Sequence, residues 1–226
     1  MDSMTVDREI WITGLGAITP IGCGADFFPA LCQGKNGVGP LTRFDTTDFP
    51  TRIGAVVNEP FLMSDLEKPL AIRFALAASA IAWQDAGLGK DRVDPLRVGV
   101  ILGTSRGLIA TLEQRIAEFI QTGTWMDRLF FPHFGSASIT QEVAAHFGAR
   151  GPVETISAAC ASSAMAIGEA VQWIRRGLAD IVITGGTEAP FSPACLQVFV
   201  RQRRCRRAIM IRNGPVALLI GNGTDM

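Results

Sequence analysis

The chain has 226 residues, 48% of them hydrophobic, so it is long enough to bury a sizeable core. Its 21 basic and 21 acidic residues cancel, but six arginines lie beyond residue 200, with only Asp225 opposing them. Residues 1–200 therefore carry 15 basic and 20 acidic groups, a net charge of −5. This balance argues against a nucleic-acid-binding surface. No apolar run is long enough to cross a bilayer.

The cysteines and the N-terminus indicate a reducing compartment. The acidic N-terminus lacks the apolar core of a signal peptide. Five cysteines, at positions 23, 32, 160, 195 and 205, show neither metal-ligand spacing nor a paired framework. We therefore expect no metal and no cofactor, and reduced thiols in the cytoplasm.

Strands and helices alternate along the chain. In order, we predict a strand at 10–14, helix 25–33, strand 53–57, helix 69–86, strand 98–102, helices 108–121 and 138–147, and a strand at 180–186. This alternation predicts α/β layering, with helices covering a mixed sheet. The pair Gly14 and Gly16 lacks the third glycine of a dinucleotide-binding loop, which argues against that function.

Cys160 stands where a β-favouring stretch passes through small residues into a helical pattern. Ala164, Ile167, Val171 and Ile174 recur at spacings of three and four, as on one helix face. Unpaired N–H groups at a helix start favour the thiolate, which is the nucleophilic form. A buried cysteine used as a small apolar residue is the alternative.

Several segments carry a resemblance to one family. They are residues 12–22, 43–45, 98–107, 151–152, 155–163 and 185–188. Together they resemble the β-ketoacyl-acyl-carrier-protein synthases of the thiolase superfamily, over roughly residues 8–199. The resemblance implies a layered αβαβα sandwich made of two similar halves, of which this chain supplies the N-terminal one.

The resemblance also implies a chemistry. Cys160 would take an acyl group from acyl carrier protein, and malonyl carrier protein would lose carbon dioxide and condense with it. The Cys160 N–H would be one oxyanion donor. Leu112 and Phe130 fall where the family lines its acyl pocket, near a twofold interface, so a homodimer is expected for an intact protein. The family's two histidines, its lysine and its glycine-rich oxyanion loop belong to the second half, and no segment here matches them.

The resemblance ends after Phe199. We expect residues 1–200 to form the synthase half and 201–226 to be a basic tail, translated out of frame and outside the fold. One choice of codons for residues 219–226, read in another frame, spells a segment typical of the family. A genuine short protein with a basic extension is the alternative.

Three functions stay open. The first is a condensing enzyme of fatty-acid or polyketide synthesis, inactive in condensation as this chain. The second is a non-catalytic remnant or an interaction subunit; a decoy chain-length subunit is disfavoured because Cys160 is intact. The third is a cysteine hydrolase in which His133 or His146 acts as the base.

Overall fold

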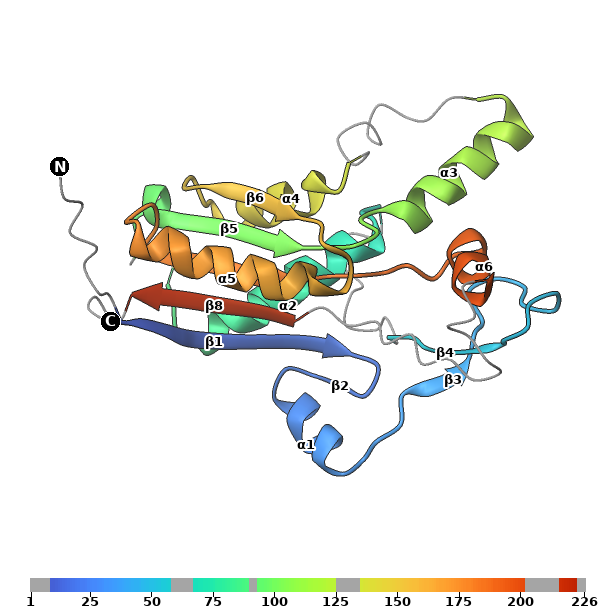
Figure 1. Ribbon diagram of the computed structural model, residues 1–226, viewed down its shortest axis with the longest axis horizontal. Coiled ribbons are helices and arrows are strands. Elements are labelled where there is room, and N and C mark those ends of the chain that lie inside the picture. Colours follow the sequence, from blue (N-terminus) through green and yellow to red (C-terminus); the bar gives the residue numbers. More distant parts are fainter. Residues whose placement is uncertain (1–8, 58–66, 90–92, 125–134, 202–215, 223–226) are drawn as a thin grey trace.

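The computed structural model describes residues 9–57, 67–89, 93–124, 135–201 and the backbone of 216–222 (Figure 1). Its main sheet has six strands in the order β2-β1-β8-β7-β5-β6. Their bounds are β1 Ile10–Thr19, β2 Gly22–Cys23, β5 Val98–Gly103, β6 Val153–Ile156, β7 Ile181–Gly186 and β8 Val216–Asn222. A second sheet pairs β3 (Val38–Pro40) with β4 (Ile53–Ala55).

Helices cover both faces of the main sheet. The α-helices are α1 Phe27–Cys32, α2 Leu70–Asp85, α3 Ile109–Thr122, α4 Ala137–Phe147, α5 Ser162–Arg175 and α6 Pro193–Arg201. The helices α2 and α4 lie on one face, and α5 lies on the other (Figure 1). Strands β5, β6 and β7 run parallel, so their carboxyl ends meet at one edge. The described part therefore has three layers.

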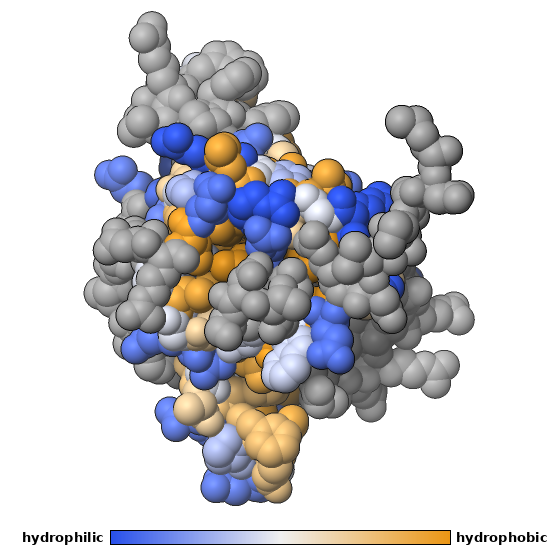
Figure 2. Space-filling model, turned by 90° about the vertical axis from the view of Figure 1, so that its left-hand side faces the viewer, coloured by the Kyte–Doolittle hydropathy of each residue, from blue (hydrophilic) through white to orange (hydrophobic). Residues whose placement is uncertain are grey.

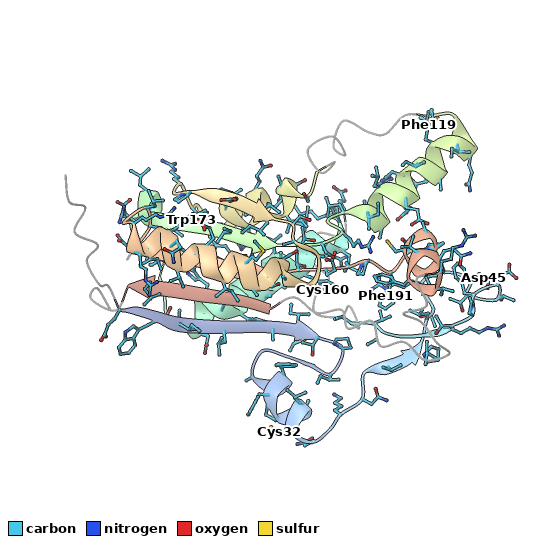
Figure 3. All side chains as sticks on the ribbon, viewed as in Figure 1. Cys32, Asp45, Phe119, Cys160, Trp173 and Phe191 are labelled. Carbon is cyan, nitrogen blue, oxygen red and sulfur yellow. The ribbon has the colours of Figure 1, made fainter. Side chains whose placement is uncertain are left out.

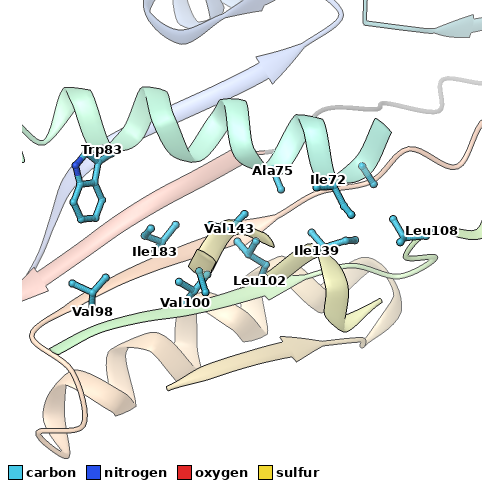
Figure 4. Close-up of a cluster of buried hydrophobic side chains, with 12 residues drawn as sticks. Ile72, Ala75, Trp83, Val98, Val100, Leu102, Leu108, Ile139, Val143 and Ile183 are labelled. Carbon is cyan, nitrogen blue, oxygen red and sulfur yellow. The ribbon is translucent and has the colours of Figure 1, made fainter. Parts of the chain in front are cut away.

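The core follows the alternation of side chains along the strands. On β5, Val98, Val100 and Leu102 pack toward α2 and α4 with Ile139 and Ile183 (Figure 4). The intervening Ile101 belongs to the opposite cluster under α5, with residues such as Trp173 and Ile174. Strand β5 is buried along its whole length, and this explains why residues 98–103 contain no polar side chain.

Strand β1 lies unusually close to α2. A Cβ on Gly14 would come within 2.1 Å of the Ala82 carbonyl oxygen, and one on Gly16 within 1.9 Å of that of Ala78. Both glycines lie inside β1, which extends to Thr19 rather than ending at residue 14. They serve strand–helix contact rather than a ligand-binding loop.

An ion pair fixes the start of β5. The Arg97 guanidinium donates from Nε and Nη2 to the Asp180 carboxylate at 2.8 and 2.7 Å, and from Nη1 to the Gly177 carbonyl at 2.7 Å. The Asp180 carboxylate raises the pKa of Arg97 above its ordinary value. These bonds tie β5 to the loop between α5 and β7.

The structure differs from the sequence-based expectation in the tail. Val216–Asn222, which we expected outside the fold, form β8 between β1 and β7, antiparallel to both. Helix α6 also continues to Arg201. The proposed change of reading frame stays a prediction.

Strand β1 and helix α3 are among the elements that leave apolar side chains exposed. On β1, Trp11 and Leu15 are 56% and 57% exposed. Helix α3 projects from the body and buries none of its residues (Figure 1). A view of the end of the molecule at the left of Figure 1 shows apolar side chains at the surface among charged ones (Figure 2).

Candidate active site

Cys160 lies in a short turn between β6 and α5. The turn is a 3₁₀ helix, Ala159–Ala161, that follows the carboxyl end of β6 by two residues and runs directly into α5. Cys160 is exposed directly before the first turn of α5 (Figure 3). The positive end of a 14-residue helix therefore lies beside it. The alternative of a buried apolar cysteine is wrong.

The backbone before Cys160 is strained. Ala159 has a φ of 49°, and it is the one non-glycine residue with positive φ in the described part of the chain. An L-residue with a Cβ pays for this left-handed conformation, so neighbouring contacts must hold it.

Ser162 makes those contacts. Its hydroxyl oxygen accepts from the Ala158 N–H at 2.8 Å, and its O–H donates to the Ala159 carbonyl at 2.7 Å. Ser162 as a whole residue is only 4% exposed. The Ser162 hydroxyl thus holds one backbone group before Ala159 and one that belongs to Ala159.

The strand ends press directly against the start of α5. A Cβ on Gly103, the last residue of β5, would lie 2.3 Å from the Ser162 carbonyl carbon. One on Gly186, the last residue of β7, would lie 1.8 Å from the Ser163 Oγ. Only glycine permits this approach, which sets the position of the Cys160 turn relative to the sheet.

The loop after β5 is held by one carboxylate. Glu188 accepts from the Ser105 N–H and hydroxyl, both at 2.7 Å, and from the Arg106 N–H at 3.2 Å. The Thr104 hydroxyl accepts from the Gly107 N–H at 3.0 Å. This loop adjoins the Cys160 turn through Gly103, so Glu188 gives it a defined shape.

The predicted pocket roles of Leu112 and Phe130 stay predictions. Leu112 lies half-buried on α3, and Phe130 lies outside the described residues. A cleft of ≈ 550 Å³ lies between α2, α3 and residues 189–193, with Arg73, Phe74 and Phe191 in its wall. The described residues that line it include neither Cys160 nor Leu112.

The structure offers no base for a hydrolase in the residues it describes. His146 is exposed near the end of α4, its ring 4.9 Å from that of Phe147. That end of α4 leads into the start of β6, whereas Cys160 follows the end of β6. His133 lies outside the described residues. Among those residues there is also no His/Cys/Asp/Glu group that could hold a metal ion.

Cys160 could be predicted as a candidate from the sequence, but the residues that hold its turn could not. The φ of Ala159 leaves no sequence signal, because alanine rarely adopts that conformation. Ser162 and Glu188 fall inside the segments that carry the family resemblance, but their hydrogen bonds become visible only in three dimensions. No helix in the described ranges is long and apolar enough to span a membrane.

The fold and this turn define a class: layered α/β proteins that present a cysteine where a parallel strand leads into a helix. Residues 7–212 match the family described as beta-ketoacyl synthase, N-terminal domain. The chain belongs to the β-ketoacyl synthase family, and its fold is the N-terminal half of the thiolase-like α/β architecture. The fold class expected from the sequence is confirmed.

Curated relatives come from fatty-acid and polyketide synthesis. The chain is 34% identical over 214 residues to 3-oxoacyl-acyl-carrier-protein synthase 2 of Synechocystis, covering 91% of this chain and 50% of that protein. It is 31% identical to the tetracenomycin ketoacyl synthase alpha subunit of Streptomyces glaucescens, covering 85% and 49%. The chain thus spans about half the length of these relatives.

Solved structures of ketosynthases have a fold similar to that of this chain. A ketosynthase complexed with its type II polyketide acyl-carrier protein is 25% identical, with a TM-score of 0.83, covering 96% of this chain and 58% of that one. The ishigamide ketosynthase/chain length factor has a TM-score of 0.85 at 24% identity, covering 96% and 59%. The second likeness concerns the fold alone.

Proposed function

We propose that this chain is the acyl-accepting half of a β-ketoacyl synthase, with Cys160 as its nucleophile. One observation carries the proposal: an exposed thiol stands on a strained, clamped turn at the start of α5. Family membership supports it. Fatty-acid and polyketide relatives match the chain alike, so the pathway is left open.

In the proposed acyl transfer, the Cys160 thiolate attacks the carbonyl carbon of an acyl thioester. The carbonyl oxygen becomes an oxyanion, to which the Cys160 N–H donates. The intermediate collapses as the bond from the carbonyl carbon to the donor's sulfur breaks. The departing thiolate takes a proton from water, and the acyl group stays on Cys160.

In the condensation implied by the family, a malonyl thioester loses carbon dioxide. The resulting carbanion attacks the Cys160 thioester, and the Cys160 thiolate leaves as the β-ketoacyl product forms. The histidines needed for these steps match no segment of this chain. We therefore propose that this chain alone accepts acyl groups without condensing them.

Acyl carrier protein is the proposed acyl donor, because the ketosynthase of similar fold is complexed with one. We also propose a homodimer, formed along β6, because β6 ends the main sheet and its Val153 is 42% exposed. The cysteines that the structure describes are free thiols, which supports a cytoplasmic location.

Acyl transfer can be tested on the full chain. A short acyl-pantetheine thioester is incubated with the protein, and each cysteine-containing peptide is examined by mass spectrometry. Cys32, which is also exposed, provides an internal control. We expect the acyl group on Cys160 at least about tenfold faster than on Cys32, because the turn activates only the former. The Cys160→Ala variant should lose the fast reaction.

Iodoacetamide supplies the complementary measurement, since it alkylates any accessible thiolate. If Cys160 is alkylated but never acylated, the proposed activity is wrong. The chain would then be a non-catalytic remnant or an interaction subunit, an interpretation that the exposed Trp11 and Leu15 would favour. Carbon dioxide release from malonyl-pantetheine would contradict the claim that the chain does not condense.

A further inference from the structure

The Ala159 carbonyl is held by two donors from a single residue. Ser162 donates to it through its hydroxyl at 2.7 Å and through its backbone N–H. The same hydroxyl oxygen accepts from the Ala158 N–H. Ser162 therefore fixes the peptide unit between Ala159 and Cys160, and it also holds the peptide unit that precedes Ala158.

The direction of that carbonyl determines the direction of the Cys160 N–H. The two groups belong to one planar trans peptide unit, so they point to opposite sides. With the Ala159 carbonyl turned toward Ser162, the Cys160 N–H points away from Ser162. A hydrogen bond to the carbonyl also polarises the unit and strengthens its N–H as a donor.

The strain at Ala159 makes this fixation necessary. A φ of 49° is unfavourable for alanine, so the peptide would rotate toward a relaxed conformation if its contacts weakened. Rotation of the unit between Ala159 and Cys160 would turn the N–H out of line with an oxyanion. The thiol itself would remain exposed and reactive.

We propose that Ser162 is a positioning residue for acyl transfer, because its hydroxyl orients the Cys160 N–H as oxyanion donor. This rests on the proposed function of Cys160. The hydroxyl contributes where a carbonyl oxygen gains negative charge and contributes little to a reaction that forms no oxyanion.

Two reactions of the same thiol separate these effects. Acylation by an acyl-pantetheine thioester passes through an oxyanion, whereas alkylation by iodoacetamide does not. In Ser162→Ala, the backbone N–H of residue 162 still donates to Ala159, so the donor is loosened rather than lost. We expect acylation of Cys160 to slow about tenfold, less than the roughly 10²- to 10³-fold cost of removing an oxyanion donor. Alkylation should change less than about threefold.

A pair of isosteric variants separates the loss of the hydroxyl from a change in side-chain shape. Ser162→Thr and Ser162→Val give side chains of the same branched shape, but only threonine keeps the hydroxyl. The Thr variant should acylate Cys160 about tenfold faster than the Val variant, with equal alkylation rates. Thermal unfolding of all variants shows whether the comparison is made between folded proteins.

The outcomes are distinct. Equal acylation by the Thr and Val variants, or a parallel loss of acylation and alkylation, overturns the role of Ser162 and leaves the function of Cys160 standing. Absence of acylation in the unaltered chain overturns both proposals. A drop in acylation alone, restored by threonine and not by valine, supports the positioning role.

Discussion

Gly103 and Gly186 explain why the nucleophile's turn can lie against the ends of two strands. A methyl group at either position would clash with the start of α5, at 2.3 Å from the Ser162 carbonyl carbon for Gly103 and 1.8 Å from the Ser163 Oγ for Gly186. The first of these neighbours is backbone, which cannot swing aside. The position of Cys160 therefore depends on the lack of a Cβ at Gly103 and Gly186.

A matched pair of glycine substitutions tests this. Gly103→Ala should destabilise the chain by about 1–3 kcal/mol and slow Cys160 acylation, because the start of α5 must move. Gly168→Ala, in the middle of α5 with no atom near its Cβ position, should stabilise by about 0.5–1 kcal/mol. Chemical denaturation measures both. A Gly103→Ala variant with unchanged stability would show that α5 is not held as described.

At the scale of elements, the local patterns in the sequence predicted one central strand and three of the helices well. The strand at 98–102 and the helices at 69–86, 108–121 and 138–147 match β5, α2, α3 and α4 within a residue or two. Their apolar spacing is strong and local. The prediction for residues 25–33 was less accurate, because a 3₁₀ turn precedes the six-residue α1.

Pairing over long distances was not predictable in this way. The segment 216–222 follows an arginine-rich segment, and its local sequence does not predict that it pairs with β1 and β7. The clamp at Ser162 was missed for a similar reason, since a hydroxyl bonded to a backbone carbonyl has no sequence pattern of its own. The pocket roles of Leu112 and Phe130 stay predictions.

The outer edge of β6 is the proposed interface of the homodimer. An exposed strand edge favours pairing with another strand, and Val153 adds an apolar contact. Val153→Lys should shift the chain from dimer to monomer in sedimentation, because it places a charge on each side of the twofold contact. Leu178→Lys is the control, since Leu178 is 48% exposed and lies outside β6. A dimer that survives Val153→Lys would argue for another interface.

At the scale of the whole molecule, β8 joins the two parts of the main sheet. Without it, β1 and β2 would have no strand linking them to β7, β5 and β6. Leu218 pairs with Leu15 on one side and with Thr184 on the other. The ladder bonds of this strand are therefore a global determinant of stability.

Proline substitution tests the role of β8. Leu218→Pro removes a backbone N–H from a central strand and should abolish the cooperative thermal transition. Thr224→Pro, two residues beyond β8, should leave the melting temperature unchanged. The measurement is circular dichroism during heating. A normal transition for Leu218→Pro would mean that residues 216–222 do not stabilise the sheet, which would agree with a tail outside the fold.

The position of β8 also affects how the protein is made. Ile10 of β1 pairs with Asn222, so the ribosome adds 212 residues after Ile10 before its partner is in place. At roughly 5–20 residues per second, this takes on the order of 10–40 s. During that time β1 has emerged, but the strand that joins it to the rest of the sheet has not been synthesised. For most of its synthesis the nascent chain therefore exposes the edge of β1 that β8 later covers, and an open apolar strand edge favours aggregation.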